Sequence, residues 1–152
     1  MLFRSVSSAG GNPRRTSNGS DYNRSAMLLA VLEKRGGLKM SASDAYINVV
    51  GGLDLNEPAA DLATILAVAS SYVDKPIGDD VVAIGEVGLT GEIRSVSFIN
   101  QRISEVHRLG FKKCIVPMSG KTQYIVPKGL KLIEVKGLRD ALAGAIGAKR
   151  ES

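Results

Sequence analysis

LNEPAADLATILAVA, residues 55–69, is the stretch that decides the fold of this chain. Within its last eleven residues only Asp61 and one threonine are polar, and a helix that is apolar almost all round must be enclosed by other elements. Pro58 suits the first helical position, where its missing N–H costs nothing, and Asn56 or Glu57 can accept the free amide hydrogens there. The sequence therefore predicts a buried helix at the centre of the fold.

The composition is that of one globular domain, with 152 residues of which 44% are hydrophobic. A single cysteine, Cys114, excludes an internal disulfide, and with His107 as the only histidine no four-ligand zinc site can be assembled. No apolar run approaches the roughly 20 residues that span a bilayer, and the N-terminus lacks the apolar core of a signal peptide. These features lead us to expect a cytoplasmic protein with no membrane partner.

The net charge of +5 and an isoelectric point near 9.5 raise the question of a polyanionic partner. Charge alone does not establish one, because many basic domains bind no nucleic acid. Arg14 and Arg15 lie on a polar loop rich in turn residues, directly before a helix. Such a pair is either a solvated linker or a way of offering guanidinium groups to phosphate.

The apolar pattern predicts a mixed α+β fold, without the strict alternation of a doubly wound sheet. A short β-favourable segment opens the chain at residues 2–6. Helices are further expected at residues 22–35, 98–109 and 138–146, and strands at 38–40, 45–50, 81–84, 114–116 and 130–135. The strands at 38–40 and 45–50 are expected to pair antiparallel. The glycines at 85, 88 and 91 predict a bend followed by a tight hairpin.

Three arginines fall on the apolar faces of predicted helices. Arg24 and Arg35 share one face of the first helix, where each must either extend its head to solvent or meet an anion. Arg102 lies in the apolar arc of the helix at 98–109. A cation in that arc is either a packed stem with an exposed head or part of a site that faces the central helix.

Other catalytic motifs are incomplete. The Gly-Lys-Thr sequence at 120–122 lacks the glycine that a phosphate-binding loop needs five positions earlier, where Ile115 stands, so we expect no nucleotide hydrolysis. His107 lies among charged residues and is expected at the surface. Nothing around it resembles a nucleophile elbow.

The sequences EPAAD at 57–61, GEVGLTGEI at 85–93 and INQR at 99–102 resemble the proteolytic domain of the Lon proteases. In that family a serine nucleophile and a lysine form the catalytic dyad, and these positions correspond to Ala59 and Arg102. Alanine has no attacking oxygen, and an arginine with a pKa above about 12 cannot act as a base near neutral pH. The resemblance implies a scaffold that has lost its peptidase, with Arg102 partly buried against a carboxylate of Asp61, Glu57 or Glu86.

A second resemblance covers nearly the whole chain. It is carried by NPRRTSNG at 12–19, DYNR at 21–24, AVLEKR at 30–35, GGL at 51–53 and GEVGLTGEIR at 85–94. These sequences resemble the C-terminal Lon-like domain of the RadA (Sms) family of bacterial DNA repair proteins. The implied fold is a Lon proteolytic-domain-like (ribosomal protein S5 domain 2-like) mixed sheet with packed helices. Residues 1–19 would be a strand and linker from a preceding ATPase domain, 20–148 the Lon-like domain and 149–152 a disordered tail.

The RadA resemblance also implies partners. The domain would bind DNA and help to assemble a hexameric ring during recombinational repair, branch migration and the stress response, with a RecA-type recombinase as a further partner. It would hold no cofactor, since ATP, Mg and Zn belong to the other domains of that family. The expected phosphate contacts are Arg14, Arg15, Arg24, Lys34, Arg35 and Arg94.

Two alternatives to the DNA-binding module remain open. One is a Ser-Lys peptidase with a rearranged site, in which Ser97 acts with Lys34 or Lys39. The other is a purely structural oligomerisation domain whose positive charge is incidental. A fluorogenic peptide assay separates the first alternative from the DNA-binding module, and a salt titration of DNA binding separates the second.

Overall fold

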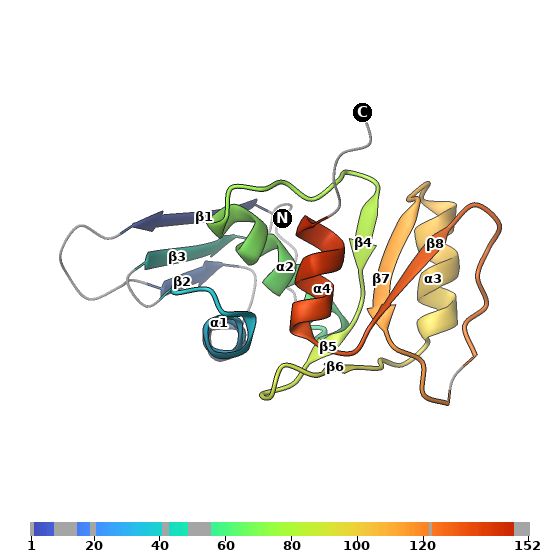
Figure 1. Ribbon diagram of the computed structural model, residues 1–152, viewed down its shortest axis with the longest axis horizontal. Helices are drawn as coiled ribbons and strands as arrows, with labels where there is room; N and C mark the ends of the chain where they lie inside the picture. The colour runs from blue at the N-terminus through green and yellow to red at the C-terminus, as the bar shows by residue number, and fades with distance from the viewer. Residues whose placement is uncertain are drawn as a thin grey trace.

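The computed structural model describes residues 2–7, 15–18, 21–40, 43–48, 56–121 and 123–147, and its elements are shown in Figure 1. The helices are α1 (Tyr22–Gly36), α2 (Asp61–Tyr72), α3 (Ile99–Arg108) and α4 (Leu138–Ile146), with a 3-10 turn, η1 (Pro58–Ala60), directly before α2. The strands are β1 (Leu2–Ser7), β2 (Arg15–Asn18), β3 (Ser43–Asn48), β4 (Val81–Ala83), β5 (Glu86–Val87), β6 (Ile93–Arg94), β7 (Lys113–Pro117) and β8 (Lys131–Val135).

Two three-stranded sheets of different character are joined in the fold by a two-stranded sheet, β5-β6. In the first, with the order β1-β3-β2, β1 runs antiparallel to β3 and β2 runs parallel to it. In the second, with the order β4-β7-β8, all strands are parallel, and Cys114 lies between Val82 and Leu132. The predicted α+β class is confirmed by this mixture of sheets and helices.

The first sheet differs from its sequence prediction in two strands. Residues 38–40 do not pair with β3, because β1 and β2 occupy its two edges. Instead, the backbone turns at Met40, whose N–H donates to Leu38 O (3.0 Å) and whose carbonyl accepts from Ser43 N (3.0 Å). Arg15–Asn18, which was expected to be a loop, forms β2 through its pairing with β3. The expectation of an antiparallel pair of strands at 38–40 and 45–50 is therefore wrong.

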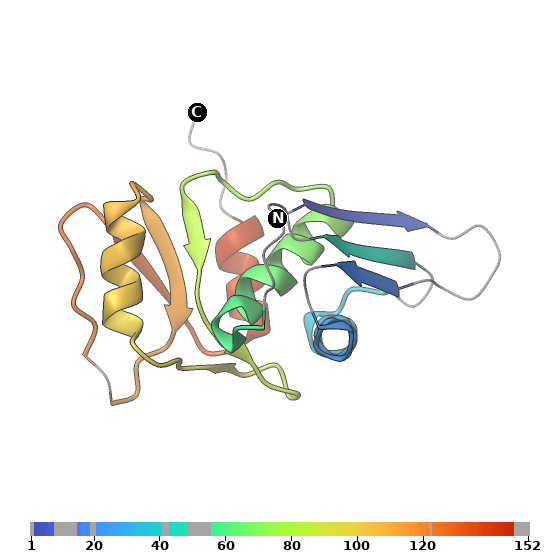
Figure 2. The ribbon, with the colours of Figure 1, turned by 180° about the vertical axis from the view of Figure 1, so that it is seen from behind.

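The predicted central helix is confirmed. Figures 1 and 2 show α2 between the two sheets, and its side chains Leu62, Ile65, Leu66 and Ala69 are almost fully buried. Pro58 occupies the first position of the 3-10 turn that precedes it, and the Glu57 side chain accepts from Ala59 N (3.3 Å). The chain thus begins this helical segment with the residues that the sequence indicated.

The β4-β7-β8 sheet separates two apolar cores. Alternate residues of β7 point to opposite faces, as the pleat of a strand requires. Ile115 packs in the core that α1, α2 and α4 share. Cys114 and Val116 pack in a second core under α3, with Ile103 at its centre. Both faces of this sheet are therefore covered by helices.

One connection runs along an edge of the molecule. The hairpin of β5 and β6 turns through Gly91, whose φ of +85° favours glycine, and Gly91 N donates to Gly88 O (3.0 Å). Gly91 O accepts from Leu138 N (2.8 Å), which ties the hairpin to the start of α4. From the hairpin, residues 94–98 follow the lower edge in Figures 1 and 2 as far as α3. We call residues 88–98 the edge segment.

Candidate functional site

Ala59 and Arg102, the positions predicted to correspond to the Lon dyad, contact the same carboxylate. Glu57 Oε1 accepts from Ala59 N at 3.3 Å and lies 3.4 Å from Arg102 Nη2. Arg102 Nε also donates to Ser97 O (3.0 Å), and the Arg102 side chain is 32% exposed. The predicted contact between a partly buried Arg102 and a nearby carboxylate is confirmed, with Glu57 as the partner.

The chemistry of this position follows from its two side chains. Ala59 is buried and offers a methyl group, while Arg102 offers a guanidinium that is already engaged by Glu57 and Ser97 O. Within the described residues, no hydrogen bond joins the Ser97 hydroxyl to Lys34 or Lys39. The geometry at Ala59 and Arg102 therefore supplies neither the nucleophile nor the base of a Ser-Lys dyad.

Arg24 is held by a buried carboxylate. Its Nε donates to Asp61 Oδ1 (2.5 Å) and its Nη2 to Asp61 Oδ2 (2.5 Å), and the Asp61 side chain is only 2% exposed. Asp61 Oδ2 also accepts from Val87 N (3.1 Å), and hydrogen bonding to Asp61 raises the pKa of Arg24. The Arg24–Asp61 ion pair and the bond from Val87 N to Asp61 thus join α1, α2 and β5. The expected phosphate contact of Arg24 stays a prediction. The Nε and Nη2 atoms of its guanidinium already donate to Asp61.

Arg94 is held on the edge segment by two carboxylates. Its Nη2 donates to Glu92 Oε1 (2.5 Å), and its Nη1 lies 3.5 Å from Glu86 Oε1. Thr90 donates to the other Glu92 oxygen from its hydroxyl (2.5 Å) and from its N–H (3.1 Å). The bond from Thr90, with those from the Glu92 backbone and Arg94, lowers the pKa of Glu92 to about 2. The charge of Arg94 is therefore largely balanced within the domain.

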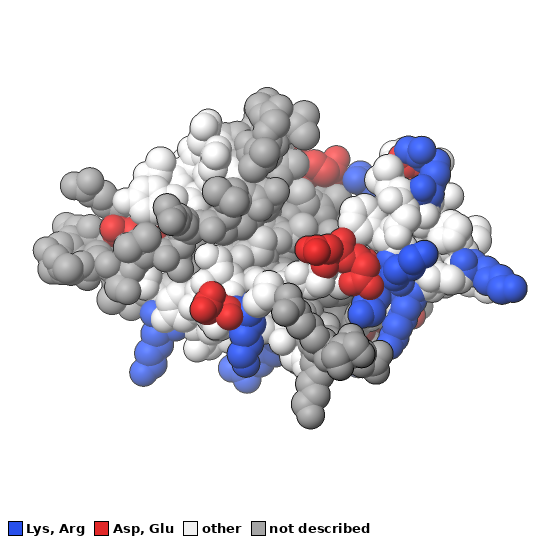
Figure 3. All heavy atoms as spheres, turned by 90° about the horizontal axis from the view of Figure 1, so that it is seen from above, with Lys and Arg blue, Asp and Glu red and all other residues white. Residues whose placement is uncertain are grey.

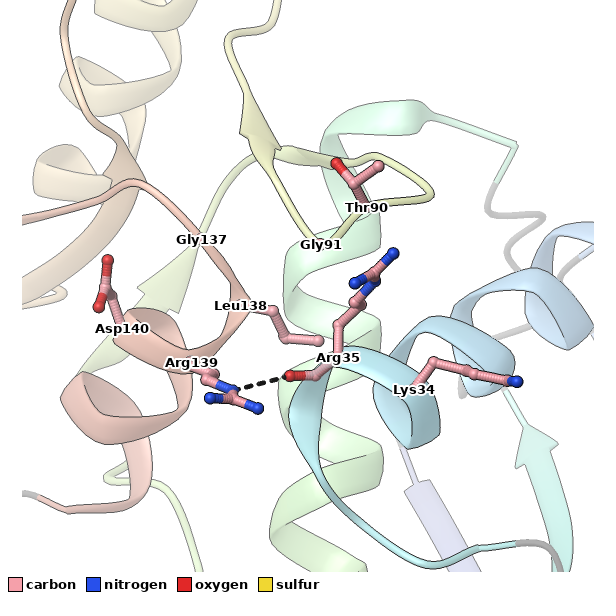
Figure 4. Close-up of a pocket in the computed structure, with 8 residues that line it drawn as sticks. All are labelled: Lys34, Arg35, Thr90, Gly91, Gly137, Leu138, Arg139 and Asp140. Carbon is pink, nitrogen blue, oxygen red and sulfur yellow. Dashed lines mark hydrogen bonds between the residues drawn. The ribbon is translucent and has the colours of Figure 1, made fainter.

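A different set of cations lines an open pocket of about 420 Å³ between the end of α1 and the start of α4. Figure 4 shows the pocket, in which Arg35 extends toward the turn of the β5–β6 hairpin at Thr90 and Gly91. Arg139 Nε donates to the carbonyl of Arg35 (3.1 Å), and Lys34 adds a third cation. Within the described part of the chain, these three cations have no ion pair, although Asp140 lies on the pocket wall.

The pocket divides the sequence-predicted cations into two groups. Lys34 and Arg35 lie together on it, whereas Arg24 and Arg94 lie elsewhere and are paired with carboxylates. Arg15 lies half-buried in β2, and Arg14 falls outside the described residues. Figure 3 shows Lys and Arg side chains along the lower left edge of the view and over its right-hand part, where some lie beside Asp and Glu. Among the predicted phosphate contacts that the structure describes, Lys34 and Arg35 are thus the two that are exposed and have no ion pair.

Arg139 is a member of this pocket that the sequence did not reveal. It lies 104 residues from Arg35, whose carbonyl it contacts, so no local pattern joins the two. The sequence pattern at 138–146 predicted the helix α4 but not which element packs against it. Arg139 becomes a candidate only when α4 is packed beside α1.

The part of the chain that the structure describes contains neither a metal-binding cluster nor a membrane-spanning helix. No group of three or more His, Cys, Asp or Glu side chains there could hold a metal ion. None of the described helices is long and apolar enough to cross a bilayer.

A family model described as subunit ChlI of Mg-chelatase matches residues 21–120, more than half of the sequence. The chain belongs to this ChlI family. The ChlI match includes Ala59, Arg102, Lys34 and Arg35, and Arg139 lies beyond its end.

Individual relatives of this ChlI-family chain carry the name DNA repair protein RadA. The relative from Bacillus subtilis (strain 168) is 48% identical over 137 residues, which are 90% of this chain and 30% of the relative. Those from Streptococcus pneumoniae (strain ATCC BAA-255 / R6) and Haemophilus influenzae (strain ATCC 51907 / DSM 11121 / KW20 / Rd) are each 48% identical over 132 residues, 87% of this chain and 31% and 29% of theirs. The predicted kinship with RadA is thereby confirmed, and the chain spans about 30% of the length of these relatives.

Proposed function

We propose that this chain is a Lon-like domain of a RadA-type DNA repair protein, and that it binds DNA through phosphate contacts. The observation that carries the proposal is the pocket with Lys34, Arg35 and Arg139, three cations without an ion pair among the described residues. Arginine and lysine side chains of this kind supply most of the sequence-independent affinity for nucleic acid. The names of the relatives support the repair context.

The same proposal includes the absence of peptidase activity. It is supported by the side chains at the two dyad positions, a methyl group at Ala59 and a guanidinium at Arg102 that Glu57 engages. A charged guanidinium cannot accept the proton of a nucleophile near neutral pH. The likeness of these positions to the Lon dyad remains part of the proposal.

A wider role is proposed together with the domain, because the sequence resembles the RadA family. We infer that it works in the bacterial cytoplasm as part of a hexameric ring in recombinational repair and branch migration, with a RecA-type recombinase as partner. Since the chain spans about 30% of its relatives, ATP, Mg and Zn would be handled by other parts of such proteins. The domain itself would need no cofactor.

A salt titration of DNA binding tests the proposal. Affinity for a labelled duplex and a labelled single strand is measured across a salt series for the wild type, Lys34→Ala/Arg35→Ala and Arg139→Ala. Each lost phosphate contact should flatten the slope of log affinity against log salt by about 0.7 to 0.9. Lys75→Ala is the matched control, because it removes an exposed cation beyond the end of α2.

Further variants test the other expected contacts. Arg14→Ala/Arg15→Ala and Arg24→Ala are measured in the same series, after circular dichroism has shown that each is folded. Unchanged affinity and slope in all of the pocket variants would contradict phosphate binding by this pocket. The domain would then be assigned a structural role in assembly.

A further inference from the structure

β8 is the outer strand of the β4-β7-β8 sheet, and the edge that faces away from β7 is open. Among the described strands only β7 pairs with β8. Figure 1 shows β8 in front of α3, and Figure 2 shows it behind α3 and β7. An outer edge of this kind presents backbone donors and acceptors with which a further strand can pair. We call it the open edge of β8.

The hydrogen bonds to β7 determine which residues of β8 face outward. On the β7 side, Lys131 donates through its N–H (2.9 Å) and Val135 accepts through its carbonyl (2.8 Å). Alternate residues of a parallel strand bond to the same neighbour, so Leu132 and Glu134 direct their N–H and C=O groups to the open edge. Outside the pairing of β7 with β8, none of these groups has a backbone partner in the described part of the chain.

The open edge ends at the hairpin of β5 and β6. Lys136 O accepts from Ile93 N (3.1 Å), and an isolated bridge joins Gly137 to Glu92. An added strand can therefore extend along β8 only as far as this hairpin. The other end of β8, at its first residue, has no such block among the described residues.

Lysines gather at that first end of β8. Lys131 begins the strand and is bonded through its backbone to Lys112 O (2.9 Å), and Lys128 lies in the turn that Leu130 N closes on Pro127 O (3.2 Å). These three lysines are exposed and have no ion pair among the described residues. Figure 3 shows Lys and Arg side chains over its right-hand part, the side on which β7 and β8 lie in Figure 1. The open edge thus has a positive end.

We propose that the open edge of β8 binds an extended acidic segment of a partner protein as an additional strand, with its carboxylates beside Lys112, Lys128 and Lys131. A peptide backbone offers both donors and acceptors to Leu132 and Glu134, whereas the phosphates of a nucleic acid offer acceptors alone. A second copy of this chain would bring the same lysines and a net charge of +5, so like charges disfavour it. In strand addition the backbone bonds supply affinity and the side chains supply specificity.

Amide hydrogen exchange, followed by NMR on the isotope-labelled domain, tests where the segment binds. The probes are two peptides of alternating valine and threonine, one with aspartates at its amino end and one with aspartates at its carboxyl end, for parallel and antiparallel addition. At saturation, one of them should slow the exchange of the Leu132 and Glu134 amides by about tenfold or more. The amide of Ile133, which faces β7, should be unaffected.

A proline substitution tests the backbone bonds. Glu134→Pro removes an outward N–H, which the edge of a sheet tolerates. It should lower the affinity for the better probe, measured by fluorescence anisotropy, by about tenfold or more. Glu134→Ala is the matched control, because it removes the same exposed side chain and keeps the N–H. Methylation of the probe's backbone nitrogens should weaken binding to the wild type equally, and this measurement does not depend on the folding of a variant.

A charge reversal tests the preference for acidic segments. Lys128→Glu/Lys131→Glu should bind the aspartate probe at least about tenfold more weakly than the wild type and should bind a probe with lysines in place of the aspartates more tightly. Lys75→Glu/Lys121→Glu reverses two exposed lysines elsewhere and should change neither affinity by more than about twofold.

Three outcomes would overturn the proposal. Undiminished binding of the methylated probe, together with loss of binding in the charge-reversed variant, would show that the lysines attract any polyanion. Protection of the Leu132 and Glu134 amides that rises with protein concentration, without peptide, would assign the edge to a second copy. Slow exchange of both amides in the dilute free domain would show that the edge is already covered. Phosphate binding at Lys34 and Arg35 is tested separately, because these residues line another surface.

Discussion

The guanidinium of Arg24 donates a hydrogen bond to each carboxylate oxygen of Asp61, which is almost completely buried at the start of the central helix. The pair connects α1 to α2, and a third bond from Val87 N to Asp61 adds the edge of the hairpin. A buried carboxylate is tolerated only when its charge and lone pairs are satisfied. Arg24 is therefore first of all a structural residue, whatever else its exposed portion contacts.

Arg24→Ala should destabilise the domain strongly. It leaves the Asp61 carboxylate buried without its counter-charge, which typically costs about 3 to 5 kcal/mol. Urea unfolding followed by circular dichroism measures the loss. Lys34→Ala, which removes an exposed cation from the same helix, should change the free energy of unfolding by less than about 0.5 kcal/mol. Equal stabilities of the two variants would show that the pair contributes nothing.

Glu92→Gln should strengthen DNA binding. It removes a negative charge and leaves Glu86 as the remaining described carboxylate beside Arg94, so the salt slope should steepen by about 0.7 to 0.9 if the guanidinium then meets a phosphate. The matched control is Glu105→Gln, which releases Arg108 from a similar double contact near the end of α3. Because that end lies away from the edge segment, Glu105→Gln should leave the slope unchanged. The same gain in both variants would indicate a general charge effect.

The effect of Glu92 on Arg94 should not vary between pH 5.5 and pH 8. The pKa of Glu92 is lowered to about 2, chiefly by the hydrogen bond from Thr90, so the folded carboxylate stays ionised over this range. A carboxylate with a lowered pKa stabilises the fold above its ordinary value near about 4.3 and loses that effect as the pH falls toward 2. The ratio of the affinities of Glu92→Gln and wild type should thus be equal at both pH values. A ratio that changes within this window would place the pKa of Glu92 much higher.

The dyad positions should stay inactive even when the catalytic atoms are restored. Ala59→Ser alone would lack a base, since Arg102 remains charged. Adding Arg102→Lys supplies an amine, but Glu57 beside it would keep the proton bound. Fluorogenic peptide assays should show no cleavage by the wild type or by either variant. Cleavage by the wild type that a serine-directed inhibitor blocks would refute the loss of peptidase function.

Cys114 should react with thiol reagents only when the domain unfolds. Burial raises the pKa of its thiol to about 12, so the folded protein holds it neutral. From about pH 8.5 upward the unfolded thiol ionises while the folded one does not, and the free energy of unfolding should fall with pH. At pH 9.5 this term is roughly 1 kcal/mol and should be missing from Cys114→Ala. Rapid labelling of the folded protein at pH 8 would contradict this prediction.

Sequence patterns predicted the elements whose burial is decided locally. The run after Pro58 predicted α2, since an almost wholly apolar helix has to be enclosed. The pattern did not predict β2, because Arg15–Asn18 contains few residues that favour strands and is ordered by its pairing with β3. Strand pairing depends on partners that are distant in sequence, which explains the error at residues 38–40.

The candidate site could likewise be predicted only where the signal is local in the sequence. Lys34 and Arg35 could be proposed from charge and position alone, and the carboxylate contact of Arg102 followed from the likeness to the Lon dyad. The pairing of Arg24 with Asp61, 37 residues away, could not be deduced, because a helix face does not show what will pack against it. The exposure of Phe98 could not be deduced either, because it depends on the left-handed backbone conformation of this residue, directly before α3.

The pairing of β4 with β7 determines whether the domain can be cut into two separately folding halves. Because β4 precedes the edge segment and β7 follows it, each half of the chain contributes a strand to the same parallel sheet. A fragment that ended near residue 97 would expose one edge of β4. It would also lack the apolar side chains of α3 that pack in the same core as Ala59 and Ile84. The two halves should consequently recombine as complementing fragments, and neither should melt cooperatively alone.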